Sequence, residues 1–311
     1  MSTIFLGTSQ FAATVLEQLA GDASLRPALV LTRPDRPSGR GRRISSPPVA
    51  ERARALGLAL EQPESVNDPQ ARALIAAAAG AEAPTLIVCA FGALIKEPLL
   101  SEQEILNVHP SLLPRWRGAA PVERAIMAGD TRTGVCIMRL TAGLDTGPVC
   151  LCGEEPITPQ DTYGSLSARL ARLGGELLLR ALRERPRFSE QAEQGVTYAE
   201  KIGPGDRLLD PARAAVELER LVRALSPHIG ARLQLGDGTF LGVQRAAVLE
   251  AEAGPWQAGV VAPAAEPLVW EGRLVLPCAQ GALELLEVQP PGGRVMDGAA
   301  YLRGHAAPGR A

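Results

Sequence analysis

Short apolar runs alternate with amphipathic helical patterns between residues 2 and 185, and this alternation restricts the fold more than any other feature. Strands that alternate with helices are typical of a parallel sheet whose crossover connections are helical. Residues 2–8 predict a strand, and residues 9–20 predict a helix with apolar side chains on one face. The run 85–91 is continuously apolar, as in a strand that is covered on both faces. We therefore expect an α/β domain built on a mostly parallel sheet with flanking helices.

The other elements of this domain follow the same pattern. Strands are predicted at 26–32, 104–109 and 133–140, and helices at 49–57, 70–80 and 162–185. Asp68 followed by Pro69 marks the start of one of these helices, because Asp is a preferred N-cap and proline suits the first helical position. The periodicity is lost after residue 185, where proline, glycine and polar residues accumulate. We assign residues 1–188 to the α/β domain and residues 189–206 to a linker.

The pattern changes again in residues 207–311. One helix is predicted at 210–225, with Asp210 as its N-cap. Strand-like runs separated by turn residues follow it at 231–235, 239–250, 258–263, 268–279 and 282–290. Several short strands in succession favour a small barrel. The predicted fold is thus a Rossmann-like α/β domain followed by a small C-terminal OB-like β-barrel domain.

The composition excludes some classes of function. A length of 311 residues favours two domains, and 46% hydrophobic with 21% charged residues is ordinary for a soluble globular protein. The formal net charge of −2 excludes nucleic-acid binding by overall basicity but permits a local basic segment. No apolar run has membrane-spanning length, and the N-terminus lacks a secretory pattern. We expect a soluble protein that is not secreted and does not engage a membrane.

Cysteine and histidine usage points to the cytoplasm and away from metal binding. The five cysteines are odd in number, lie mostly in apolar runs and include no Cys-x-x-Cys pair, which favours a reducing compartment. The three histidines are scattered, so local spacing cannot assemble a zinc site. We predict a cytoplasmic protein without a metal.

The sequence NVHPSLLPRWRGAAP at 107–121 contains the candidate site. In a strand over 104–109, the period of two places Asn107 and His109 on the same face. Pro110 cannot continue the hydrogen-bonding ladder, so both polar side chains lie at the carboxyl end of the strand. Ligands of open α/β sheets bind at that edge.

These side chains suit acyl-type transfer. Asn107 can hold a developing oxyanion, and His109 can donate a proton or a hydrogen bond near neutral pH. Asp145, within GLDTG after the predicted strand 133–140, can orient the imidazole, and its neighbours Gly143 and Gly147 permit a close backbone approach. A Gly-x-Ser-x-Gly motif is absent, so we expect the attacking group to belong to the substrate. Each of the three residues alone also has an ordinary structural explanation, and only their combination favours a site.

A basic segment precedes this site in the chain. Residues 33–43, RPDRPSGRGRR, carry five arginines and one aspartate, and we expect neither helix nor ladder there because of the prolines and glycines. Such a segment is suited to phosphate contact, although a solvated charged loop is the common alternative.

The sequence NVHPSLLPRWRGAAPV together with GLDTG resembles the formyltetrahydrofolate-dependent formyltransferases, and TRPDRPSGRGRR and VTYAEKI are similar to the members that act on tRNA. The resemblance implies catalytic roles for Asn107, His109 and Asp145. It implies folate contacts at Ser111, Leu112, Leu113 and Pro114, and the apolar wall of these leucines with Phe91 and the space beside Gly92 suit a flat pteridine. It implies contacts with tRNA at Arg36, Arg40, Arg42 and Arg43.

The implied reaction transfers the formyl group of 10-formyltetrahydrofolate, a co-substrate, to the α-amine of methionine on initiator tRNA. A monomer that binds the tRNA acceptor end, with a tRNA-contacting C-terminal domain, is expected from the same resemblance. The ten arginines, absent lysines and eleven acids of residues 207–311 leave the extent of that second contact open.

Other functions share part of this pattern. A sugar-amine or glycinamide ribonucleotide formyltransferase, or a formyltetrahydrofolate hydrolase, would use the same three polar residues, but its substrate requires neither the arginine segment nor the barrel. A non-catalytic folate- or RNA-binding module would retain the fold without needing proton-transfer groups. A dehydrogenase is disfavoured because GTSQF, after the first strand, lacks the glycine pattern that binds a pyrophosphate.

Overall fold

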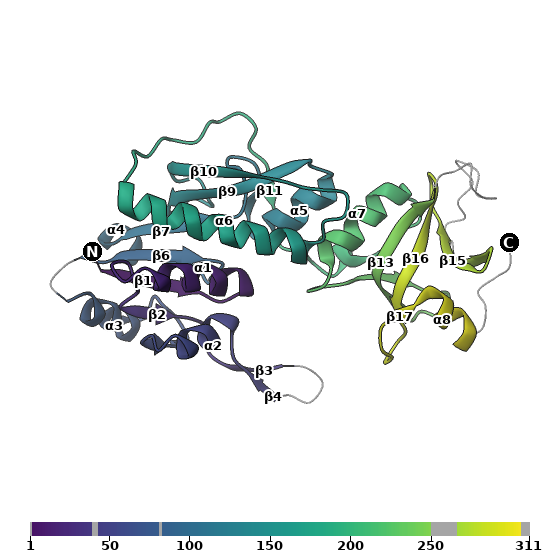
Figure 1. Ribbon diagram of the computed structural model, residues 1–311, viewed down its shortest axis with the longest axis horizontal. Helices are drawn as coiled ribbons and strands as arrows, with labels where there is room; N and C mark the ends of the chain where they lie inside the picture. The colour runs from purple at the N-terminus through teal and green to yellow at the C-terminus, as the bar shows by residue number, and fades with distance from the viewer. Residues whose placement is uncertain (1, 39–42, 81–82, 250–265, 306–311) are drawn as a thin grey trace. The chain divides into compact units, whose positions relative to one another are not determined.

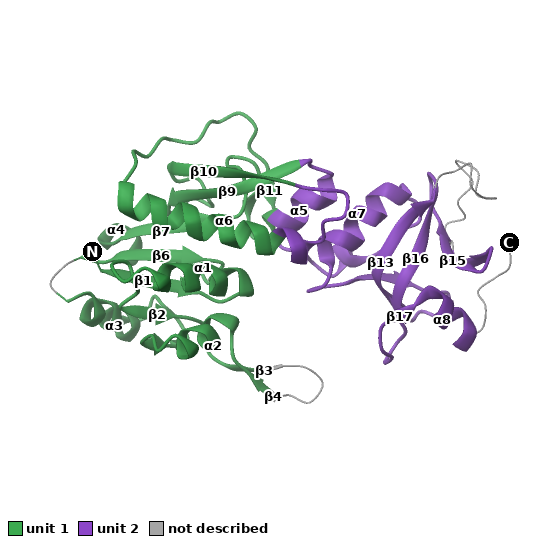
Figure 2. Cartoon of the chain, in the orientation of Figure 1, with its two compact units in different colours: residues 1–121, 132–156, 167–199 green, residues 122–131, 157–166, 200–311 purple. Residues whose placement is uncertain are grey.

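The computed structural model describes residues 2–38, 43–80, 83–249 and 266–305. The chain divides into two compact units, which are coloured in Figure 2. Unit 1 comprises 1–121, 132–156 and 167–199, and unit 2 comprises 122–131, 157–166 and 200–311. Neither unit is one continuous stretch, because two short excursions, 122–131 and 157–166, join the C-terminal part. The boundary after residue 199 falls inside the segment that we assigned to a linker.

Unit 1 is built on a seven-stranded sheet (Figure 1). Its strand order is β10-β9-β7-β6-β1-β2-β5. The strands are β1 (Thr3–Gly7), β2 (Leu29–Leu31), β5 (Leu60–Glu61), β6 (Thr85–Cys89), β7 (Glu104–His109), β9 (Arg132–Arg139) and β10 (Val149–Pro156). The pairs from β5 to β7 are parallel, whereas β9 and β10 form antiparallel pairs. The predicted mostly parallel sheet is confirmed.

Helices cover both faces of this sheet. They are α1 (Gln10–Gly21), α2 (Pro48–Ala55), α3 (Pro69–Ala79), α4 (Leu99–Glu102) and α6 (Tyr163–Glu184). The helix α5 (Pro121–Ala128) belongs almost wholly to unit 2. α1 and α6 share one face, where Gly174 of α6 lies close to Val108 of β7 and Phe11 of α1. α3 covers the other face, since its Ile75 joins a core cluster with Ile105 of β7. Strand alternation then places Asn107 and His109 on this second face.

The strand that precedes Asp145, β9, does not share the direction of the parallel strands. β9 runs antiparallel to β7, with Arg139 opposite Leu106 and Cys136 opposite His109. The loop that follows β9 therefore leaves the sheet beside the first half of β7. Asp145 reaches the site from this loop and not from the carboxyl edge of a parallel strand.

The basic segment also differs from expectation. Its two ends form a short antiparallel hairpin of β3 (Arg36–Ser38) and β4 (Arg43–Ser45), in which Pro37 lies opposite Ile44. A proline is tolerated here because the ladder has only two strands and its outer edges need no donor. Residues 39–42, which connect the two strands in the sequence, lie outside the described residues.

Unit 2 contains an antiparallel sheet, as predicted for the C-terminal region. Its strands are β12 (Ala231–Gln234), β13 (Phe240–Leu249), β14 (Leu268–Trp270), β15 (Arg273–Pro277), β16 (Ala282–Gln289) and β17 (Met296–Asp297). They pair in the order β12-β13-β16-β15-β14, with β17 beside β16. Its helices are α7 (Ala215–Leu225) and α8 (Gly298–Gly304), and a 3-10 turn spans Gly205–Arg207. The expected strand at 258–263 lies outside the described residues.

The start of α7 corrects one prediction. The helix begins at Ala215, five residues after the position that we expected, and its N-cap is Ala214. Asp210 instead accepts a hydrogen bond from the Ala212 amide at 2.9 Å and caps a local turn. Ala214 pairs with Gln280 in an isolated bridge, so tertiary pairing keeps this backbone extended where local propensity favours a helix.

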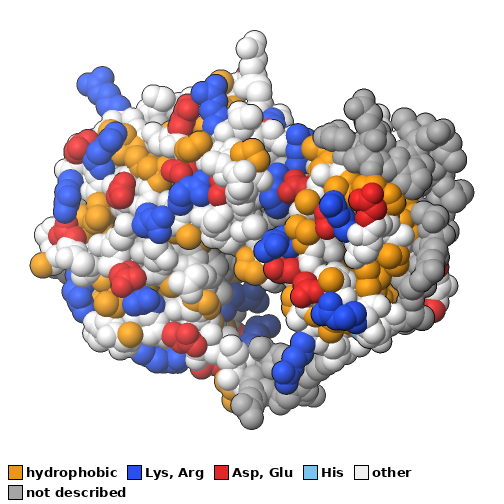
Figure 3. Space-filling model, turned by 45° about the vertical axis from the view of Figure 1, so that its right-hand side comes forward, with side chains coloured by type: hydrophobic (Ala, Val, Ile, Leu, Met, Phe, Trp, Pro, Cys, Tyr) orange, Lys and Arg blue, Asp and Glu red, His pale blue; other side chains and the backbone are white. Residues whose placement is uncertain are grey.

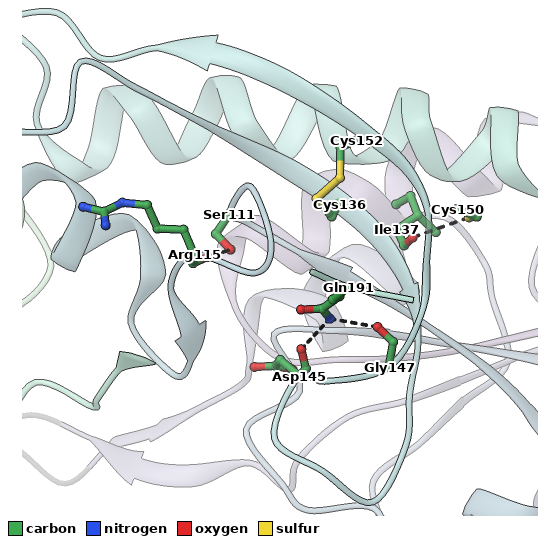
Figure 4. The surroundings of a disulfide bond; sticks show 9 residues. All are labelled: Ser111, Arg115, Cys136, Ile137, Asp145, Gly147, Cys150, Cys152 and Gln191. Atoms are coloured by element: carbon green, nitrogen blue, oxygen red, sulfur yellow. Dashed lines mark hydrogen bonds between the residues drawn. A yellow bond between two sulfur atoms is a disulfide. The ribbon is translucent and has the colours of Figure 1, made fainter. Parts of the chain in front are cut away.

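A disulfide between Cys136 of β9 and Cys152 of β10 was not expected from the cysteine pattern (Figure 4). The two residues are direct cross-strand partners, and Cys136 is also the partner of His109. Cross-strand partners point to the same face, so the disulfide and His109 share one row of side chains. Spacing along the chain could not reveal this pairing, because it depends on the register of β9 and β10.

In the part of the chain that the structure describes, no helix has both the length and the apolar character required to cross a membrane.

Candidate active site

The last residues of β7 supply the two polar side chains of the candidate site. Asn107 is 8% exposed and His109 is 4% exposed, so both are nearly withdrawn from water. Burial of an amide and an imidazole is unfavourable unless they have hydrogen-bond partners. The partners come from two loops, the one after β7 and the one after β9.

The imidazole of His109 lies between two acceptors. Its Nε2 is 3.0 Å from the Trp116 carbonyl oxygen, and its Nδ1 is 3.7 Å from Oδ2 of Asp145. A carbonyl can only accept, so Nε2 carries the hydrogen of that bond. A hydrogen on Nδ1 would face the carboxylate of Asp145. The ring is therefore oriented by backbone on one side and by a negative charge on the other.

Asp145 is the point at which the three polar groups meet. Its Oδ2 accepts a hydrogen bond from the Gly118 amide at 2.8 Å, and its Oδ1 lies 3.5 Å from Nδ2 of Asn107. The contacts to Asn107 and His109 are long, as catalytic contacts often are before substrate binds. Asn107, His109 and Asp145 thus converge, although 36 residues of chain separate His109 from Asp145.

Glycine is required at the end of the Asp145 loop. A Cβ atom at Gly147 would collide with the carbonyl oxygen of Arg139, and it would lie 3.0 Å from Cγ2 of Thr141. The backbone collision cannot be relieved by a side-chain rotation. The close approach that GLDTG predicted is therefore present at its last glycine.

We expect Gly147→Ala to lower the catalytic rate at least tenfold, because the displaced loop carries Asp145 and misplacement by an ångström can reduce rates about a hundredfold. Steady-state kinetics of the purified variant would measure this. Gly21→Ala is the matched control, because a Cβ at Gly21 meets nothing within 4 Å. Equal activity of the two variants would contradict the steric argument.

Three of the five non-glycine residues with positive φ in the described part of the chain lie in the loops after β6, β7 and β9. Ala90, Trp116 and Asp145 have φ values of 42°, 61° and 48°. Such left-handed conformations are unfavourable for residues with a Cβ, by about 1–3 kcal/mol each, and persist where the surroundings impose them. Two of these residues contact His109 directly, and the third precedes Phe91 and Gly92. Their concentration favours a functional site.

The predicted folate-contacting residues differ in availability. Leu112, Leu113 and Pro114 are half-buried, whereas Ser111 is wholly buried and its hydroxyl donates to the Arg115 carbonyl oxygen at 2.7 Å (Figure 4). The half-buried side chains offer apolar surface beside the site, but Ser111 closes the turn beneath them. Its hydroxyl is thus already engaged within the protein.

Phe91 and Gly92 lie in the loop after β6. The Phe91 side chain belongs to the core cluster under α3 and is 5% exposed, which differs from the open aromatic wall that we expected. The Phe91 carbonyl oxygen accepts a hydrogen bond from the Thr8 hydroxyl at 2.7 Å. Gly92 is exposed, with φ of 71°, and a Cβ there would approach only Arg33, at 3.8 Å. Space beside Gly92 is thus present.

The base of the basic hairpin is held by Asp35. Its carboxylate accepts hydrogen bonds from Nε2 of Gln62 at 2.7 Å and from the Ser46 hydroxyl at 2.8 Å, and it lies 3.6 Å from Arg54. These contacts hold the pKa of the Asp35 carboxyl below its usual value, and the hydrogen bond from Gln62 has the largest effect. The carboxylate therefore stays charged near neutral pH and fixes the start of the hairpin.

The four predicted tRNA-contacting arginines are described to different extents. Arg36 is exposed and lies 3.4 Å from the exposed Glu64. A surface pair of this kind contributes little to stability, so Glu64 can release Arg36 to another anion. Arg43 is placed only as a backbone position of β4, and Arg40 and Arg42 lie outside the described residues.

Sequence reasoning missed Gln191 and Thr197, which hold the site from behind together with Arg117. Gln191 hydrogen-bonds the Asp145 loop, Arg117 lies beneath it with 9% exposure, and Thr197 accepts a bond from the Trp116 amide at 2.9 Å. β8 (Arg117–Gly118) pairs in parallel with β11 (Tyr198–Ala199). The motif VTYAEKI contains β11. It was the one sequence signal that residues 189–206 have a role besides connecting two domains.

The cysteines provide no candidate nucleophile. Burial raises the pKa of the Cys89 thiol far above its usual value and raises that of Cys278 to about 12. Burial also raises the pKa of the half-buried Cys150 thiol. The remaining two cysteines form the disulfide. Thiolates are the reactive form of cysteine, so an attacking group from the substrate remains the better explanation.

The surface charges form no general basic face in the view of Figure 3. Lys and Arg side chains there are interspersed with Asp and Glu side chains. In unit 2, several described arginines are paired with acids, as in Arg245–Glu287 at 3.0 Å. Contact with a polyanion therefore has to come from local groups and not from the overall field.

Sequence comparisons relate the whole chain to formyl transferases. Residues 1–182 match the Formyl transferase family, and residues 201–306 match the Formyl transferase, C-terminal domain family. A methionyl-tRNA formyltransferase of Dechloromonas aromatica is 41% identical over 313 residues, covering 98% of this chain and 96% of the relative. Another, from Halorhodospira halophila, is 42% identical over 309 residues, covering 97% of this chain and 95% of the relative.

Solved structures share the fold. The methionyl-tRNA formyltransferase from Clostridium thermocellum aligns with a TM-score of 0.59 and 14% identity, covering 79% of this chain and 93% of that structure. The N-formyltransferase from Helicobacter canadensis, in complex with folinic acid and dTDP-3-aminofucose, aligns with a TM-score of 0.63 and 13% identity over 91% of this chain and 98% of that structure. The family matches extend over both parts of the chain, and the sequence relatives match it over nearly their full lengths. The chain therefore belongs to the formyl transferase family.

Proposed function

We propose that this protein transfers the formyl group of 10-formyltetrahydrofolate to the free α-amine of methionyl-initiator tRNA in the cytoplasm, acting as a monomer. The convergence of Asn107, His109 and Asp145 carries the proposal. Its specificity for tRNA is supported by relatives about 40% identical over nearly the whole chain that are methionyl-tRNA formyltransferases. We also propose that residues 1–188 carry catalysis, that 189–206 connect the parts and that 207–311 contact tRNA.

In the proposed reaction, the amine nitrogen bonds to the formyl carbon and the bond from that carbon to the folate nitrogen breaks. Negative charge develops on the formyl oxygen during attack. Asn107 supplies a neutral N–H donor for this oxygen in a site with little water, where such a donor is effective. His109 supplies the second donor and the proton for the departing nitrogen, and Asp145 keeps its ring in place.

The attacking amine must be unprotonated. An α-amino group ordinarily titrates near pH 8, so a useful fraction is neutral at physiological pH. Asp145 can accept the proton that the amine loses, directly or through water. The raised thiol pKa values are consistent with an enzyme that needs no nucleophile of its own.

The half-buried side chains of Leu112, Leu113 and Pro114, with the open space beside Gly92, fit a flat and partly apolar donor. We propose that these residues hold the pteridine of the folate. We propose that Ser111 and Phe91, which are both buried, support this wall from beneath.

The arginines of the basic hairpin are proposed to bind phosphates at the tRNA acceptor end. We expect Arg40→Ala to raise KM for charged tRNA roughly tenfold at low salt, with a defect that shrinks as the salt concentration rises, because the variant releases fewer counterions on binding and its affinity therefore depends less on salt. Kinetics at several salt concentrations would measure this. Arg132→Ala is the matched control, since Arg132 is 70% exposed and pairs with Glu154. An unchanged KM for Arg40→Ala at every salt concentration would contradict the assignment.

The deciding experiment mixes the purified protein with 10-formyltetrahydrofolate and methionine-charged initiator or elongator tRNA. Formylmethionine should appear on the initiator tRNA, with a much lower rate on the elongator. Formylation of sugar amines or glycinamide ribonucleotide alone, or release of formate alone, would replace this proposal with the corresponding folate-dependent activity.

A further inference from the structure

The segment between residues 189 and 199 is attached to the candidate site at both ends. Ser189 pairs with Val149, at the start of β10, and β11 pairs with β8 beside Trp116. Figure 4 shows the side chain of Gln191, from this segment, reaching the backbone of Asp145 and Gly147. The segment therefore brings a polar side chain to the loop that carries the candidate catalytic carboxylate.

The amide of Gln191 makes four hydrogen bonds. Its Nε2 donates to the carbonyl oxygens of Asp145 at 2.7 Å and Gly147 at 2.8 Å. Its Oε1 accepts from Nε and Nη2 of Arg117, at 3.0 and 2.7 Å. Carbonyls only accept and a guanidinium only donates, so a single orientation of the amide satisfies all four contacts.

The groups on the two sides of this amide surround the His109–Asp145 pair. On one side is the backbone of Asp145, held at φ of 48°. On the other side is Arg117, which lies between Trp116, the acceptor for His109, and Gly118, the donor to Asp145. Gln191 thus joins the two loops that set the position of the imidazole and the carboxylate.

We propose that Gln191 is a positioning residue for formyl transfer, which fixes the carboxylate of Asp145 relative to His109 by holding the Asp145 loop against Arg117. This inference rests on the proposed function of Asn107, His109 and Asp145. Gln191 contacts neither the carboxylate oxygens nor the imidazole, so it acts through Asp145 and Arg117. A bond that only attached the segment to unit 1 would affect stability and leave the chemistry unchanged.

The test compares Gln191→Leu and Gln191→Glu with wild type and with Gln194→Leu, a control at an exposed position of the same segment. Gln191→Leu removes all four bonds. Gln191→Glu keeps an acceptor for Arg117 but replaces the donor to the two carbonyls with an oxygen. We expect both to lower kcat about tenfold to a hundredfold, with each KM changed less than about twofold. Gln194→Leu should match wild type.

A structural role predicts different results. The midpoint temperature of thermal unfolding would then be lower for Gln191→Leu than for wild type. The kcat per folded molecule would stay at the wild-type value for both variants. Gln191→Glu should fold even if Gln191→Leu does not, because the glutamate retains the contact to Arg117. A wild-type kcat in Gln191→Glu would therefore overturn the proposal, since this variant lacks the donor to the Asp145 loop.

A double-variant cycle tests the route of the effect. If Gln191 acts through the carboxylate, Gln191→Leu should lower kcat less than about twofold in an Asp145→Asn background, because interacting residues are not additive. A full, independent loss in that background would overturn the proposal. Failure of the proposed function is distinguishable, since the wild-type protein itself would then not formylate charged tRNA.

Discussion

His109→Ala is expected to lower kcat for formyl transfer by at least about a hundredfold, the usual effect of removing one donor to a developing oxyanion. The loss should exceed this value if the same ring also supplies the proton. Steady-state formylation of charged initiator tRNA would measure kcat, and thermal unfolding would report on the fold. The fold should survive, because the lost hydrogen bond, worth about 1 kcal/mol, and the cavity left by the buried ring, worth about 2–5 kcal/mol, are set against a domain stability of roughly 5–15 kcal/mol.

The matched control is His305→Ala. His305 is exposed in unit 2, and its ring contacts the Tyr301 carbonyl at 3.0 Å, so the variant removes an imidazole with a similar backbone contact. It should retain the wild-type kcat. A His109→Ala protein with more than a tenth of the wild-type kcat would exclude His109 as the proton-transfer group. If His109→Ala did not fold, its rate could not be measured. His109→Gln would then replace it in the test, because glutamine keeps a polar side chain at this buried position.

The parallel part of the sheet was predictable because its signals are local. Residues 104–109 carry an apolar alternation that ends at Pro110, and the structure ends β7 at His109. The same locality explains the helix at 163–184, whose apolar spacing is sustained over its length. Strand direction is not local. The antiparallel orientation of β9 depends on how β9 pairs with β7, which periodicity does not encode.

The site was predictable only for residues whose side-chain type and sequence pattern indicate a catalytic role. Asn107 and His109 were found together because strand alternation places them on one face, and Asp145 was found from its glycine-flanked motif. Gln191 was missed because a glutamine in a polar segment has no distinctive pattern, and its role depends on contacts with residues 44 to 74 positions away. The disulfide was missed for the same reason.

Burial also changed the roles that the sequence allowed. Phe91 reads as an aromatic wall in CAFG, but its ring is buried in the core cluster under α3. Ser111 reads as a ligand contact, but it closes a turn with Arg115. Composition and spacing are compatible with a structural role and with a ligand contact for each residue. Tertiary packing therefore decides which environment the side chain has.

Asp145→Asn separates the charge of the carboxylate from its shape. An asparagine at this position keeps an oxygen that can accept from the Gly118 amide, so the loop should keep its place. It loses the negative charge that faces Nδ1 of His109, and its NH2 group takes the place of the oxygen that faces the Asn107 amide, where two donors then meet. Comparable removal of the orienting charge from a catalytic histidine lowers rates by up to about ten-thousandfold.

We therefore expect Asp145→Asn to lower kcat by between about a hundredfold and ten-thousandfold, with little change in the midpoint of thermal unfolding. Single-turnover formylation would measure the chemical step without product release. Asp68→Asn is the matched control, because it removes the same charge from an exposed position whose side chain makes no capping bond. If Asp145→Asn kept a rate within a fewfold of wild type, the carboxylate would be needed only to shape the loop. In that case the imidazole would owe its orientation to the Trp116 carbonyl alone, since that is the only other acceptor in contact with the ring among the described residues.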